Sequence, residues 1–232
     1  MDKILDRLGI YDLWGVFIPG IIGWFSIKIL FVYLNICFGT GLGNVGDLSF
    51  ILVCSYLLGT ILHDFGRVVA GRLLYKRKKE PSYVYLSCAN DLFNEYEKQV
   101  YEKIMRKTIK ITGNVKEEYM RYFYDYCYGF LSAWQKSAKA DKFESLYGMS
   151  RSLFCFYILM GTMVIVIYPI LIAYNFNIDV KRFIISVMVC FFLSSVFYRR
   201  ALMFNESRVK VVLRTYISMQ SKKIKDLKVK DL

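Results

Sequence analysis

The residues best suited to chemistry form a short group at positions 63–67. His63 is the only histidine of the chain, and Asp64 and Arg67 follow it closely. On a helix Asp64 and Arg67 are three residues apart and can pair. A histidine beside them could act as a general base, but hydrolases and transferases also need a nucleophile, a second carboxylate or a metal cluster. None stands in register, so we expect a structural role at the end of a hydrophobic segment.

Basic residues form a second group near an expected turn at 112–114, and their charge favours a nucleotide or another anionic ligand. Neighbouring tyrosines could stack on bases, although they more often belong to a core. The alternative is a solvated basic surface. The candidate ligand-binding residues are Lys103, Arg106, Lys107, Lys110 and Lys116.

Two further basic residues border or interrupt apolar segments. Lys28 is the only charge between Leu13 and Gly46, and a charge inside a membrane segment predicts a pore or gating role. Alternatively, Lys28 snorkels to the surface or pairs with Asp47. Arg151 precedes another apolar run, where it could anchor a headgroup or pair with Glu144 or Glu206. Together with His63, Asp64 and Arg67, these residues are candidates for interfacial or gating functions.

Several classes of site lack support in the sequence. The six cysteines are scattered without a CxxC pair or a Cys/His cluster, which argues against a zinc site and a disulfide framework. No glycine-rich phosphate loop, GxSxG elbow or HExxH pattern is present. We therefore predict no metal, no cofactor and no catalytic residue.

The apolar stretches that hold these residues are long enough to cross a membrane. Residues 152–178 contain no charge, and about 20 apolar residues span a bilayer core. Mean hydropathy is +0.34, so the apolar content requires lipid or a partner. We predict an all-α protein with a four-helix transmembrane bundle, whose spans cover about 14–38, 48–62, 152–174 and 183–198.

The basic residues predict the orientation of these spans. The net charge is +13, residues 63–151 carry 17 Lys and Arg, and residues 199–232 carry 10. The turn at 39–46 has no basic residue, and the turn at 175–182 has only Lys181 and Arg182. By the positive-inside rule, we expect a multi-pass protein of the inner (cytoplasmic) membrane with both termini in the cytosol.

The segment between spans two and three is expected to form a cytosolic helical domain, at 63–151. Apolar residues recur with a helical period in 91–107 and 115–136, which predicts a helical hairpin. A third segment, 137–151, is expected to continue into span three. Residues 1–62 and 152–198 would form two transmembrane hairpins, and 199–232 a basic cytosolic tail. The stripe of the second hairpin helix is Tyr119, Tyr122, Phe123, Tyr126, Phe130 and Trp134.

The segment YDLWGVFIPGII at 11–22 is similar to the Tyr-Asp…Pro-Gly opening of many small bacterial membrane proteins. Paired spans around a cytosolic helical insert resemble the layout of membrane effectors of bacterial anti-phage defence systems. This resemblance implies a non-enzymatic, membrane-disrupting effector that a nucleotide signal or a partner protein triggers. It assigns no role to an individual residue.

These observations lead to one expected function and two alternatives. The expected function is that of a non-enzymatic effector or signalling protein. Its cytosolic domain senses a partner or anionic ligand and alters the bundle, which would be a homo-oligomer in the lipid bilayer. The first alternative is a membrane enzyme acting on lipid headgroups through His63, Asp64 and Arg67. The second is an accessory subunit of a larger membrane complex.

Overall fold

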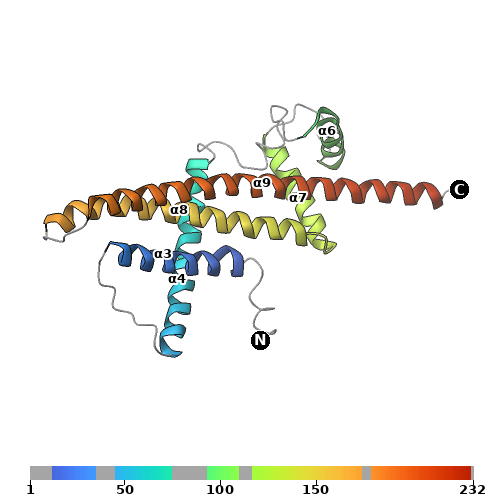
Figure 1. The fold of residues 1–232 in the computed structure, drawn as a ribbon. Helices are drawn as coiled ribbons and strands as arrows, with labels where there is room; N and C mark the ends of the chain where they lie inside the picture. The colour runs from blue at the N-terminus through green and yellow to red at the C-terminus, as the bar shows by residue number, and fades with distance from the viewer. Residues whose placement is uncertain (1–11, 35–44, 75–92, 110–116, 174–178, 231–232) are drawn as a thin grey trace. The chain divides into compact units, whose positions relative to one another are not determined.

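The computed structural model describes residues 12–34, 45–74, 93–109, 117–173 and 179–230 (Figure 1). Within these ranges every regular element is a helix, which confirms the predicted all-α class. The elements are η1 (Leu13–Phe17, a π-helix), α3 (Ile18–Tyr33), α4 (Val45–Leu74), α6 (Glu95–Ile109), α7 (Glu117–Ala133), α8 (Ala138–Ala173) and α9 (Val180–Lys230).

Four helical segments are long and apolar enough to cross a membrane, and each overlaps a predicted span. They are Leu13–Tyr33, Ser49–Val69, Ala138–Ala173 and Val180–Gln220. The protein itself buries only 17–33% of the residues in their most apolar windows. Large apolar side chains are correspondingly exposed, for example Val32 at 70% and Phe192 at 67%. A surface of this kind requires lipid as its solvent.

The helices extend beyond the apolar segments. The predicted continuation of 137–151 into span three is confirmed, because α8 begins at Ala138. Helix α4 runs to Leu74, twelve residues past the expected end of span two. Helix α9 runs to Lys230, so it includes most of the segment expected as a separate tail. Residues 199–230 contain no glycine or proline, and Lys, Arg, Leu and Met are good helix formers.

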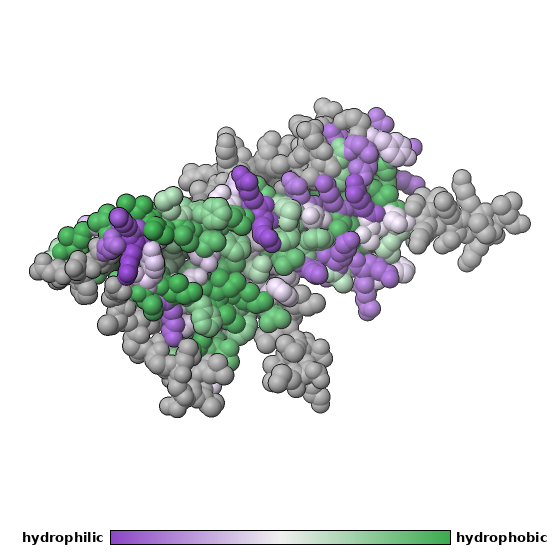
Figure 2. All heavy atoms as spheres, in the orientation of Figure 1, coloured by the Kyte–Doolittle hydropathy of each residue, from purple (hydrophilic) through white to green (hydrophobic). Residues whose placement is uncertain are grey.

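The chain divides into two compact units. Unit 1 comprises residues 1–74 and 145–202, and unit 2 comprises residues 75–144 and 203–232. Both predicted hairpin helices, α6 and α7, belong to unit 2. Helices α8 and α9 each contribute residues to both units. Figure 2 shows hydrophobic side chains over much of the visible surface of unit 1 and hydrophilic side chains over unit 2.

Small residues bring the helices of unit 1 close together. A Cβ atom at Gly20 of α3 would overlap the carbonyl of Ser55, and one at Gly59 of α4 would overlap the carbonyl of Val16. Gly161 lies against Cys190, where α8 meets α9. Glycines let helix backbones approach in a membrane, where apolar burial provides no driving force for association.

Unit 2 has an aromatic core shared by α6, α7 and α9. Phe123 and Leu131 of α7 are fully buried with Val209 and Leu213 of α9. Tyr216 meets the ring of Phe123 edge-on, with ring centroids 6.1 Å apart. This core supplies the apolar burial that stabilises the unit.

The predicted apolar stripe of α7 was partly wrong. Tyr122 and Trp134 are 62% and 59% exposed, whereas Cys127 and Leu131 are completely buried. The predicted stripe followed the aromatic residues and therefore included side chains that do not pack. The face that packs follows 123, 127 and 131, because these positions meet the second half of α9.

Candidate functional site

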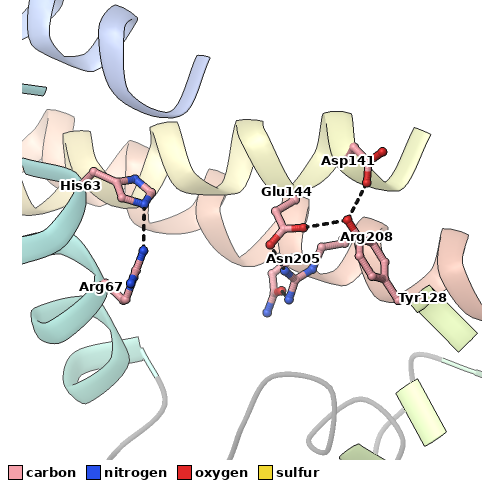
Figure 3. Close-up of polar contacts among 7 residues, drawn as sticks. All are labelled: His63, Arg67, Tyr128, Asp141, Glu144, Asn205 and Arg208. Atoms are coloured by element: carbon pink, nitrogen blue, oxygen red, sulfur yellow. Dashed lines mark hydrogen bonds and ion pairs between the residues drawn. The ribbon is translucent and has the colours of Figure 1, made fainter. Parts of the chain in front are cut away.

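The histidine group lies where α4 packs against α8 in unit 1. His63 is 5% exposed, and its Nε2 is 3.5 Å from Nη2 of Arg67, one turn further along α4 (Figure 3). Arg151 of α8 also interacts electrostatically with the imidazole. A Cβ at Gly66 would lie 3.4 Å from Cα of Ser152. The structure therefore brings together three of the five candidate interfacial residues, His63, Arg67 and Arg151, from two helices.

Arg151 has a different partner from those expected. Its guanidinium lies over the ring of Tyr147, 5.3 Å from the centroid. Glu144, one of the expected partners, instead forms an ion pair with Arg208 at 3.2 Å. Arg151 can form a cation–π contact because Tyr147 is one turn away on the same helix. The described residues therefore place a guanidinium, rather than an ion pair, at the start of the uncharged run.

The surroundings of His63 are cationic. Asp64, its neighbour in sequence, is exposed, whereas Arg67 and Arg151 both lie near the imidazole. The exposed carboxylate of Asp64 also acts on the ring, so two guanidinium groups and one carboxylate interact with it electrostatically among the described residues. Guanidinium groups bind carboxylates and phosphates through paired N–H donors. The chemistry that this arrangement supports most directly is the binding of an anion.

Lys28 lies on α3, within the candidate span Leu13–Tyr33, and is half-buried. Its expected partner, Asp47, lies in the first turn of α4. The side chains of that turn lie outside the described residues, so the pairing of Lys28 with Asp47 stays a prediction. The position of Lys28 inside an apolar helix is confirmed.

The basic group expected to bind a ligand is only partly described. Lys103 and Lys107 are exposed and lie four residues apart on α6, so they share a face of that helix. Arg106 forms an ion pair with Glu102 at 2.8 Å within the same helix. Lys110 and Lys116 lie outside the described residues. The described part of the group therefore offers two exposed ammonium groups on one helix face.

A polar network, not expected from the sequence, joins α7, α8 and α9 in unit 2 (Figure 3). The hydroxyl of Tyr128 donates a hydrogen bond to Asp141 at 2.6 Å. Arg208 binds Glu144 and donates a hydrogen bond to Oδ1 of Asn205 at 3.0 Å. Asn205 is fully buried. Such a network fixes the register of the three helices, because each buried polar group needs its partner.

Burial also sets the ionisation of the groups around this network. Burial and the bond to Asp141 raise the pKa of Tyr128, which keeps its hydroxyl a donor. Burial raises the pKa of Tyr124 to about 12. It also raises the pKa of the Cys127 thiol. These groups remain neutral at physiological pH, which suits a structural core rather than a catalytic site.

The network escaped prediction because its partners are distant in the sequence. Arg208 and Glu144 are 64 residues apart, and neither belongs to a recognisable motif. The only available signal was spacing: Asn205 and Arg208 lie on the same face of α9 as the buried residues Val209 and Val212.

Among the described residues, no group of His, Cys, Asp and Glu could hold a metal ion. No protein-family model matches the sequence, and neither the curated proteins nor the solved structures contain a significant match.

Proposed function

We propose that this protein is a non-enzymatic membrane effector or signalling protein. Unit 2 would lie in the cytosol and sense a partner protein or an anionic ligand. Unit 1 would form the membrane bundle that responds, by opening a pore or disrupting the bilayer, as in bacterial defence. Both termini would face the cytosol, and the active form would be a homo-oligomer.

One observation carries this proposal: α8 and α9 each belong to both units. Each is a single helix, over Ala138–Ala173 and Val180–Lys230. A packed helix transmits displacement because its backbone hydrogen bonds make it rigid. A ligand that changes the packing of unit 2 therefore acts on the same helices that supply two membrane spans. No flexible linker would absorb the change.

The packing of unit 1 leaves room for such a response. An apolar groove of about 420 Å³ opens between α3, α8 and α9, and Tyr157, Met160 and Cys190 are among its lining residues. A second groove, also of about 420 Å³, shares the lining residues Leu30 and Met160 with the first. Helices that pack incompletely can shift without breaking a dense core. The grooves support a bundle with more than one arrangement.

Leakage of ions on overexpression in bacteria tests the proposal. We expect the wild-type protein to depolarise cells, and we expect two glycines inserted after Glu144 in α8 to prevent this. The matched control is the same insertion after Lys136, which precedes α8. Replacement of Lys28 by Leu and reversal of charge at Lys103 and Lys107 test the pore and the sensor separately. Cells that keep their full membrane potential under every condition would contradict the proposal.

The contact of His63 with Arg67 is the one observation that favours a membrane enzyme instead. Replacement of His63 by Gln separates the two functions. Gln preserves a polar group of similar size but cannot act as a general base. If this variant inserts normally and still depolarises cells, the effector function stands. If it inserts but loses every effect on lipid, the enzyme becomes the better account.

A further inference from the structure

Two arginines from different helices converge on one point of unit 1. Arg67 of α4 and Arg151 of α8 both interact with the buried ring of His63. Neither arginine forms an ion pair with a carboxylate within the described ranges. Nε of Arg151 is buried and lacks a hydrogen-bond partner among the described residues. Two guanidinium groups that both act on one buried imidazole repel each other, so an anion bound to both would stabilise the arrangement.

The same two residues border candidate membrane spans, where lipid headgroups would lie. Arg67 is two residues from the end of the candidate span Ser49–Val69. Arg151 immediately precedes the uncharged run 152–178. Gly66 holds the backbones together at this level, since its Cα side faces Ser152 and the carbonyl of Arg151. Both guanidinium groups therefore belong to one end of the membrane bundle, where phosphate groups of lipids are concentrated.

The geometry also restricts how these side chains move. The ring of Tyr147, which is 8% exposed, lies against the guanidinium of Arg151. Arg67 is exposed, and its contact with the imidazole of His63, at 3.5 Å, restricts its guanidinium less. A guanidinium that is held in place loses less entropy when it binds, and its planar fork matches two phosphate oxygens.

We propose that Arg67 and Arg151 form a phosphate-binding site at the membrane surface and that its occupant is the headgroup of an anionic phospholipid. Both arginines belong to unit 1, so this proposal does not depend on whether unit 2 senses a ligand. A free phosphate has the same chemistry and is the other source that the test must distinguish.

Native mass spectrometry of the full chain, purified in detergent micelles that contain phosphatidylglycerol and phosphatidylcholine, tests the site. We expect the wild type to retain phosphatidylglycerol selectively. Arg67→Gln and Arg151→Gln should each reduce its retention about tenfold, which corresponds to the loss of a charge-assisted hydrogen bond. Arg200→Gln is the matched control, because Arg200 is an exposed arginine of α9 in the same unit; its retention should equal that of the wild type.

Two further measurements make the result decisive. Arg67→Lys and Arg151→Lys keep the charge and the fold but lose the fork, so they should show intermediate retention even if the Gln variants unfold. Thermal melting in phosphatidylcholine with inorganic phosphate, against chloride at equal ionic strength, tests the soluble source. Stabilisation that both Gln substitutions remove would assign the site to a soluble phosphate. Equal retention of both lipids without phosphate stabilisation, or equal loss in Arg200→Gln, would overturn the site.

Discussion

At the scale of single residues, the two tyrosines beside Arg208 differ in what their hydroxyl groups do. Tyr128 donates a short hydrogen bond to Asp141. The hydroxyl of Tyr124 is buried and finds no hydrogen-bond partner among the described residues, while its ring lies 5.8 Å from Arg208. A buried hydroxyl stabilises a fold only when its hydrogen bond is made. The same substitution should therefore have opposite results at these two positions.

We expect Tyr128→Phe to destabilise unit 2 by about 1–2 kcal/mol, because the carboxylate of Asp141 loses a donor. Tyr124→Phe should change stability by less than about 0.5 kcal/mol, or raise it, since Phe keeps the ring and removes a costly hydroxyl. Hydrogen exchange of the α7 amides in detergent measures both effects. Equal destabilisation by the two variants would contradict the network described for Tyr128.

The buried tyrosines also make unit 2 sensitive to alkali. Burial raises the pKa of Tyr101 and of Tyr124 from 10.0 to about 12. In the unfolded chain these phenols lose their protons at the lower pH, whereas the folded unit keeps them. Their contribution to stability is therefore complete below pH 10 and is lost as pH rises toward about 12.

We predict that unit 2 unfolds between about pH 10 and 12. The exposed tyrosines of unit 2 ionise first, and a second rise in phenolate absorbance, from the buried tyrosines, accompanies the loss of helical circular dichroism. Tyr124→Phe should move this transition to higher pH, because one of the ionising groups is removed. If every tyrosine of unit 2, including Tyr101 and Tyr124, instead ionised near pH 10 with the helices intact, the burial of these two tyrosines would be wrong.

At the scale of the elements, η1 and α3 approach α4 so closely at two glycines that backbone meets backbone. Side chains larger than hydrogen have no space at Gly20 and Gly59, since the partner backbone occupies the position of each Cβ. Gly129 of α7 is a useful contrast, because a Cβ there meets nothing within 4 Å.

We expect Gly20→Ala or Gly59→Ala to separate α3 from α4 and to cost about 1–3 kcal/mol. Gly129→Ala should stabilise α7 by about 0.5–1 kcal/mol, because alanine loses less backbone entropy in a helix. Thermal unfolding in one detergent compares the three variants. Tolerance of alanine at Gly20 and Gly59 together would show that the backbones do not approach this closely.

The sequence predicted some of these elements well and others poorly, for physical reasons. The spans were predictable because an uncharged run as long as 152–178 is stable only when lipid surrounds it. The buried face of α7 was not, because it depends on α9, some eighty residues later, rather than on α6 alone. The same distance hid the pair Arg208–Glu144. For the candidate site, the sequence identified His63, Arg67 and Arg151 individually, but their meeting depends on the packing of Gly66 against α8.

At the scale of the whole molecule, two compact units share two long helices. Apolar helices dominate unit 1, and a buried aromatic and polar core dominates unit 2. The proposed function, the phosphate site and the assignment of unit 2 to the cytosol all require that the four apolar segments cross a bilayer. They also require that both ends of the chain lie on the same side.

A scan of phosphatase fusions along the chain tests this topology most directly, because the enzyme is active only outside the cytosol. Fusions after Gly41, Lys110, Asn175 and Leu232 sample the segments between and after the four spans. We expect activity after Gly41 and Asn175 and none after Lys110 and Leu232. Activity after Leu232, or inactivity at all four positions with every fusion intact, would contradict it.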